Sequence, residues 1–255
     1  MSRTLISLLS LAFSVVAVHL LYIGYIRPEA ALAIEVAKQA SQTAPRVIAV
    51  ILKDYEQEIC MILMLWGTFL IFGKCLEILK HQYLFNVDFL EGSSNDNGDM
   101  TAILTTFEEL PYKVRKTPLV RVLMASLRRF IITNDVQNTS DAIESSVEAL
   151  AVKLEAENSM IRYLIWAIPS IGFIGTVRGI GQALSQADQA LAGDIAGMTD
   201  SLGVAFNSTL VALLISIVLM FLLHQLQRLQ DGLIVEAQEY CETFLLNRIS
   251  SVGRD

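Results

Sequence analysis

Residues 161–181 read IRYLIWAIPSIGFIGTVRGIG, and residues 203–223 read GVAFNSTLVALLISIVLMFLL. Both segments are apolar over about the 20 residues that a helix needs to cross a bilayer core. Glycine, asparagine and threonine interrupt them, although a helix surface that faces only lipid needs none of these residues. Such residues let helices approach closely or line a polar path between them. We therefore expect a helical membrane protein whose last two spans are built for packing and for ions.

The composition supports a protein with several membrane spans. Of the 255 residues, 53% are hydrophobic, and the mean hydropathy of +0.51 exceeds that of an ordinary soluble domain. Residues 5–26 and 59–79 are also long and apolar enough to span, which makes four spans. We interpret 5–26 as a retained signal anchor because a signal peptide has only about 7–15 apolar residues. A cleavable signal is the alternative, with Ala31-Leu32-Ala33 as its cleavage site.

Charge and cysteine content exclude several classes of function. The net charge of -7 argues against nucleic-acid binding. The three cysteines, Cys60, Cys75 and Cys241, are too few and too scattered for a disulfide framework or a zinc site, and we interpret them as packing residues. The sequence shows no nucleotide loop, metal cluster or nucleophile arrangement. We expect neither an enzyme nor a cofactor.

Basic residues near the spans predict the orientation, because cytoplasmic flanks carry more Lys and Arg. The segment 182–202 has no Lys or Arg but three acids, Asp188, Asp194 and Asp200. The opposite flanks of the last three spans are basic, with Lys74, Lys80, His81, Lys153, Arg162 and Arg228. We expect residues 80–160 and both termini in the cytoplasm, and residues 27–58 and 182–202 outside.

The chain is expected to have five parts. These are the signal anchor with an outer helical segment (1–58), the second span (59–79), a cytoplasmic helical region (80–160), a pore-forming span pair (161–225) and a cytoplasmic C-terminal helix (226–255). Apolar stripes at helical spacing flank the span pair: Ile143, Val147, Leu150, Leu154 and Ile161 before it, and Leu226, Leu229, Leu233, Ala237, Tyr240 and Phe244 after it. The last two membrane helices should therefore extend as long amphipathic helices. Their stripes need partners in the same chain or in neighbouring copies.

Three local features complete the expected helices. Pro45 is expected to open a helix that runs through residues 47–55 into the second span. The polar run at 91–99 is the clearest linker. Asp141 and Glu144 are expected to cap the helix that precedes the third span.

We expect structural rather than functional roles for two histidines and for a strip of basic residues. His19 and His224 are expected to pack at span ends rather than to relay protons. A basic strip is expected to be a solvated face near Glu108 and Glu109, and its members are Lys113, Arg115, Lys116, Arg121, Arg128 and Arg129. The alternative is that this strip meets anionic lipid or a cytoplasmic partner.

Two motifs resemble those of a known family. Residues 169–179, PSIGFIGTVRG, and residues 202–212, LGVAFNSTLVA, are similar to the last two spans of the MotA/TolQ/ExbB proton-channel family. The similarity covers roughly residues 60 to 245. It implies a homopentamer around two copies of a single-span TolR/ExbD/MotB-like partner that carries an aspartate. It also implies that Thr176 and Thr209 correspond to the family's two pore threonines.

The residues themselves are compatible with this resemblance. In the last span, small and polar residues recur on one face, namely Ala205, Ser208, Thr209, Ala212 and Ser216. We assign the ion pathway to Thr176, Thr209, Ser208, Asn207 and Ser216, because hydroxyl and amide groups can replace part of an ion's water shell. Hydroxyls that only bond a carbonyl one turn back are the alternative. We assign Gly172, Gly175 and Gly179 to helix packing.

The chain departs from the TolQ and ExbB pattern at two positions. Where that pattern has a glutamate, five residues before the second threonine, this chain has Val204. The titratable carboxylate must then come from a partner. Where the pattern has a tryptophan, this chain has Arg178, which either snorkels to headgroups or pairs at the pore mouth with Asp188, Asp194, Asp200 or an acid of the partner.

The sequence thus predicts an all-α membrane protein that is a channel subunit of an energy-transducing inner-membrane motor, for protons or sodium ions. The alternative is a non-conducting pentameric scaffold.

Overall fold

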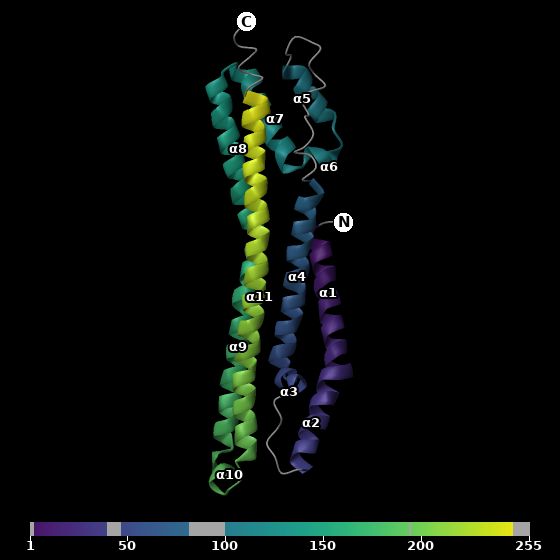
Figure 1. Ribbon diagram of the computed structural model, residues 1–255, viewed down its shortest axis with the longest axis vertical. Helices are drawn as coiled ribbons and strands as arrows, with labels where there is room; N and C mark the ends of the chain where they lie inside the picture. The colour runs from purple at the N-terminus through teal and green to yellow at the C-terminus, as the bar shows by residue number, and fades with distance from the viewer. Residues whose placement is uncertain (1–2, 40–46, 82–99, 194, 247–255) are drawn as a thin grey trace. The chain divides into compact units, whose positions relative to one another are not determined.

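The computed structural model describes residues 3–39, 47–81, 100–193 and 195–246, and within these ranges every regular element is a helix (Figure 1). The elements are α1 (Arg3–Leu21), the π-helix η1 (Tyr22–Ile26), α2 (Arg27–Gln39), α3 (Ile48–Leu52), α4 (Tyr55–His81), α5 (Met100–Glu109), α6 (Tyr112–Arg115), α7 (Pro118–Thr133), α8 (Val136–Glu157), α9 (Ser159–Ser185), α10 (Ala187–Leu191), α11 (Ala196–Tyr240) and the π-helix η4 (Cys241–Leu246).

Four stretches of these helices are long and apolar enough to cross a membrane, which confirms the predicted number of spans. They cover residues 4–37, 55–80, 136–185 and 196–243, and each contains one of the segments expected from the sequence. The protein is therefore a multi-pass membrane protein with an all-helical fold.

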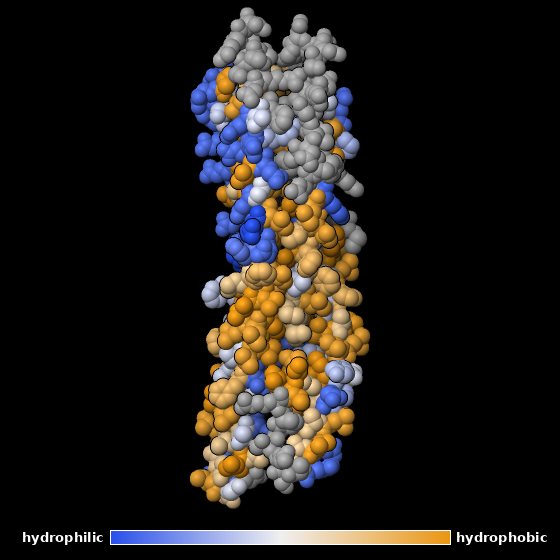
Figure 2. Space-filling model, viewed as in Figure 1, coloured by the Kyte–Doolittle hydropathy of each residue, from blue (hydrophilic) through white to orange (hydrophobic). Residues whose placement is uncertain are grey.

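The chain forms two compact units. Unit 1 comprises residues 1–72 and 160–224, and unit 2 comprises residues 73–159 and 225–255. Hydrophobic side chains cover most of the face of unit 1 shown in Figure 2. Several hydrophobic side chains of unit 1 are large and strongly exposed, including Trp166, Phe206 and Val177. A surface of this kind suits lipid or neighbouring helices rather than water.

In unit 1, α1 packs on α4 along much of its length. The indole Nε1 of Trp66 donates to the carbonyl oxygen of Ser7 at 3.1 Å. The rings of Phe13 and Phe69 meet edge to face, with centroids 5.8 Å apart. The π-helix η1, which the sequence did not predict, continues this contact with Tyr22 buried. The first span is thus an integral part of unit 1.

The helix expected to run from residue 47 into the second span is interrupted. The α3 helix ends at Leu52, a bend follows at Lys53 and Asp54, and α4 begins at Tyr55. The prediction of one continuous helix is therefore wrong. Its expected start at Pro45 and the expected linker at 91–99 lie outside the described residues.

Unit 2 has its own apolar core, built from α5, α7, α8 and the C-terminal part of the chain. Leu119, Leu123 and Leu127 of α7 are fully buried in it. Ala237, Tyr240, Cys241 and Leu245 join the same core. The apolar stripe after the fourth span therefore has partners within the same chain, although Leu229 remains 37% exposed.

The start of α8 differs from the prediction. Asn134 adopts a left-handed conformation with φ 48°, which ends α7. The side chain of Asp135 then accepts hydrogen bonds from the backbone N–H groups of Gln137 and Asn138 and so caps α8. Asp141 and Glu144, the expected capping pair, lie inside this helix. The cap sits earlier because α8 begins directly after the turn at Asn134, and the first backbone N–H groups of a helix have no partner within it.

A break also separates α8 from α9. The α8 helix ends at Glu157, and Asn158 follows it. The side-chain amides of Asn158 and Gln230 are both buried in unit 2 and hydrogen-bond at 2.7 Å. In the basic strip, Arg128 pairs with Glu108 at 2.7 Å, as expected of a solvated face with a nearby acid.

Candidate functional site

The last two spans approach each other closely where α9 carries glycine. A side chain added at Gly172 would place its Cβ 2.6 Å from that of Ala212. A side chain at Gly179 would lie 2.6 Å from the backbone nitrogen of Ala205 and 2.8 Å from its Cβ. At Gly175 the obstacle is Ser208. These three glycines thus lie where α9 and α11 touch, with backbone against backbone.

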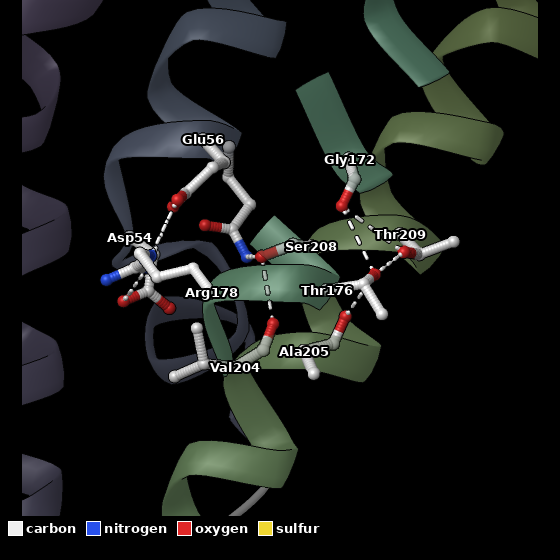
Figure 3. Close-up of polar contacts among 10 residues, drawn as sticks. Asp54, Glu56, Gly172, Thr176, Arg178, Val204, Ala205, Ser208 and Thr209 are labelled. Carbon is white, nitrogen blue, oxygen red and sulfur yellow. Dashed lines mark hydrogen bonds and ion pairs between the residues drawn. The ribbon is translucent and has the colours of Figure 1, made fainter. Parts of the chain in front are cut away.

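This close approach brings the two predicted pore threonines together. The Oγ1 atoms of Thr176 and Thr209 hydrogen-bond each other across α9 and α11 (Figure 3). Oγ1 of Thr176 also lies within hydrogen-bond distance of the carbonyl oxygens of Ala205, at 3.2 Å, and Gly172, at 3.3 Å. Oγ1 of Thr209 lies 3.3 Å from the same Gly172 oxygen. Four oxygens therefore converge in one half-buried place.

The donor roles at this place can interchange. Each of the two hydroxyls has one hydrogen to donate. Each can donate it either to a carbonyl oxygen or to the other hydroxyl. The contact of Thr176 with Gly172, four residues earlier, is the local carbonyl bond weighed as an alternative. It coexists with the contact between the threonines, so neither arrangement excludes the other.

The other polar residues of α11 do not join the threonine pair. Ser208 is 1% exposed, donates to the carbonyl oxygen of Val204 at 2.8 Å and accepts from Nε2 of Gln57 at 3.3 Å. Ser216 is buried and donates to the carbonyl oxygen of Ile165 at 2.9 Å. Asn207 is half-buried. The predicted polar face thus divides, with Thr209 toward Thr176 and Ser208 toward α4.

Arg178 pairs with acids that the sequence analysis did not connect with it. Its Nη2 lies 2.8 Å from Oε2 of Glu56, and its Nε lies 2.7 Å from Oε1 (Figure 3). Oδ1 of Asp54 is 3.6 Å away. The described contacts of Arg178 include no ion pair with Asp188 or Asp200, and Asp194 lies outside the described residues. A partly buried guanidinium in a membrane span needs an acid within reach, and the corner between α3 and α4 supplies two.

The acids at the start of α4 are buried, whereas their basic partners are partly exposed. Glu58, whose side chain is 7% exposed, pairs with Arg27 at 2.5 Å and with Nδ1 of His19 at 2.6 Å. His19 therefore does not simply pack at a span end; it binds an acid, with 52% of its side chain exposed. Burial raises the pKa of Asp54, and the nearby Lys53 and Arg178 oppose this rise.

The sequence carries a signal for this cluster. Asp54, Glu56 and Glu58 stand within five residues at the entrance to an apolar span. Acids placed there must find cations as the span is buried. Arg27 and Arg178, near the ends of two other spans, were the available partners.

Comparison with protein-family models gives one match. Residues 114–239 match the model of the MotA/TolQ/ExbB proton channel family. This range contains α9, α11 except its last residue, and both threonines, whereas α1 and the whole of α4 lie outside it. Comparisons with curated proteins and with solved structures give no match.

Proposed function

The chain is a member of the MotA/TolQ/ExbB proton channel family, and from this we propose that it is an ion-channel subunit of an energy-transducing motor in the bacterial inner membrane. Membership supports a membrane subunit that transduces energy rather than an enzyme. The transported ion in this proposal is the proton, with sodium as the alternative.

The observation that carries the proposal is the threonine pair. Thr176 and Thr209 place two hydroxyls beside the carbonyl oxygens of Gly172 and Ala205. A cluster of neutral oxygens can replace part of the water shell of a proton or a sodium ion. The glycines support the same role, because their close contact fixes the spacing of the two helices that hold the pair.

The titratable group of the pathway is proposed to come from a partner. Position 204 is a valine, and Asp54 and Glu56, the acids that contact Arg178 of α9, are already paired with it. A paired carboxylate exchanges protons less readily than a free one. We assign the missing acid to an aspartate on a single-span TolR/ExbD/MotB-like protein, of which two copies stand inside a pentamer of this chain. The basic flanks support cytoplasmic N- and C-termini.

The alternative is a pentameric scaffold that does not conduct. In that case the threonines would only join α9 to α11, and the glycine contact would serve assembly alone. The two proposals differ in one measurable property, because a conductor must lose ion flux when both hydroxyls are removed.

The test is the double variant Thr176→Ala with Thr209→Ala, made in the complex purified with its partner. We expect the complex to assemble and its ion flux into vesicles to fall to background. Thr68→Ala is the matched control, because Thr68 is a span threonine whose hydroxyl bonds only a carbonyl one turn back, at 2.8 Å. Unchanged flux in the double variant would contradict the proposed pathway.

A further inference from the structure

A row of polar side chains leads from the surface of unit 1 to Ser208, the neighbour of Thr209. The exposed fraction of the side chain falls from 36% at Arg178 to 15% at Asp54 and 10% at Glu56. Gln57 and Ser208, at the inner end, are 0% and 1% exposed. The row therefore runs from partly open to fully buried, through residues that belong to α9, to the corner between α3 and α4, and to α11.

Gly175 lies where the residues of the row approach one another most closely. A Cβ placed on Gly175 would come 3.3 Å from Cγ of Glu56 and 2.5 Å from Oγ of Ser208. Gln57 reaches the same hydroxyl, because its Nε2 lies 3.3 Å from Oγ of Ser208. The absence of a side chain on Gly175 thus brings an acid, an amide and a hydroxyl into one place inside a membrane span.

Several polar atoms of this region have no hydrogen-bond partner among the described residues. They are Oε1 of Gln57, Oδ2 of Asp54 and the hydroxyl of Tyr22, and all are buried. Tyr22 lies near the same corner, because Leu52 of α3 and Met61 of α4 pack against its apolar cluster. Buried polar atoms in proteins are nearly always bonded, either to the protein or to water. Orphaned atoms that gather at one end of α4 therefore indicate a hydrated place.

We propose that Asp54, Glu56 and Gln57 line a hydrated inlet through which water and the transported cation reach Ser208 and, beside it, Thr209. Arg178 is the cation that pairs with both acids, so the inlet is polar without a large excess of either charge. The inlet deepens the proposed function, because it gives the threonine pair an access route along a helix that the family match does not include.

Thiol accessibility tests the inlet without any measurement of transport. Ser208→Cys is made in the full chain, in membrane vesicles, in a background where Cys60, Cys75 and Cys241 are replaced by alanine. The probe is the silver ion, which is small, stays in water and reacts with thiols. Ser216→Cys is the matched control, because Ser216 is a buried serine of the same helix whose hydroxyl donates to the carbonyl oxygen of Ile165 and has no described contact with the row.

The inlet predicts that the thiol at position 208 reacts with silver at least about tenfold faster than the thiol at position 216, because reactivity follows access to water. Gln57→Leu, which replaces the amide with an apolar group of similar size, should slow the reaction at 208 and leave 216 unchanged. Equal rates at the two positions, whether both slow or both fast, would overturn the inlet.

The outcome is separable from that of the proposed function. Fast reaction at position 208 in a complex that carries no ion flux would support the inlet and contradict the channel. Loss of flux in the threonine variants together with slow reaction at 208 would support the channel and overturn the inlet.

Discussion

Replacing Gly179 by alanine should destabilise the contact between α9 and α11. The new Cβ would lie 2.6 Å from the backbone nitrogen of Ala205 and 2.8 Å from the carbonyl oxygen of Ser201. Backbone atoms cannot rotate away, so restoring an ordinary separation of 3.4 Å requires the helices to part by about 0.8 Å, the difference from the 2.6 Å contact. Overpacking of this kind costs about 1–3 kcal/mol.

The matched control is Gly181→Ala, two residues further along the same helix. Nothing lies within 4 Å of the position that its Cβ would take. Alanine there keeps only the gain in helix propensity, about 1 kcal/mol. Gly179→Ala has the same gain in helix propensity, so its free energy of unfolding should lie below that of Gly181→Ala by the overpacking cost alone, about 1–3 kcal/mol.

Unfolding in mild detergent, followed by circular dichroism against denaturant concentration, measures this difference. The same samples report assembly by gel filtration. Equal stability of the Gly179→Ala and Gly181→Ala variants would refute the close packing on which the threonine geometry depends.

Three further predictions concern charged residues. Arg178→Gln should lower the free energy of unfolding by about 1–3 kcal/mol, and by more than Glu56→Gln does, because it leaves the more deeply buried Glu56 unpaired. The double variant should recover most of this loss. Equal losses for the two single variants in a denaturant titration would contradict the asymmetry. The pKa of Asp54 is raised by burial, so its stabilising effect is complete at acid pH and is lost as the pH rises through this raised pKa. Asp54→Asn should abolish that loss, and a pH-independent difference in melting temperature between variant and wild type would count against it. Backbone hydrogen bonds from Asn138 and Gln137 lower the pKa of Asp135, so the stability that it contributes is present at neutral pH and is lost as acid protonates it. Asp135→Ala should therefore lower the melting temperature at neutral pH more than Asp141→Ala does. Equal effects of the two substitutions would contradict the assignment of the helix cap to Asp135.

The parts of the fold that depend on local pattern could be predicted from the sequence. Four apolar stretches of sufficient length predict four spanning helices, because no other structure satisfies the backbone of a single chain segment in lipid. The small residues of α9 and α11 indicated a close contact because small side chains let two helix backbones approach each other. The spacing of Thr176 and Thr209 gave no distance between them, and their hydrogen bond emerges only once the glycines have brought the helices together.

The features that were missed depend on contacts between distant parts of the chain. Arg178 was expected either to snorkel to headgroups or to pair with the acids that follow it or with an acid of the partner, whereas Glu56, to which it binds, lies 122 residues earlier in the chain. The bend at Lys53 and Asp54 was missed because helix propensity alone does not show that Asp54 must turn toward Arg178. Ser208 was grouped with Thr209 by helical spacing, but Gln57 of another helix draws it to a different neighbour.

Ion flux through the assembled complex distinguishes the channel from the scaffold. The chain is purified from its native host in mild detergent with whatever single-span protein it retains, and the complex is reconstituted in liposomes. An internal pH dye follows proton entry under an imposed membrane potential, and a sodium dye follows sodium in parallel samples. The account predicts that one of the two ions enters faster than in empty liposomes, and that Thr176→Ala with Thr209→Ala abolishes this entry while Thr68→Ala preserves it. An intact complex that admits neither ion would contradict the channel and favour the scaffold.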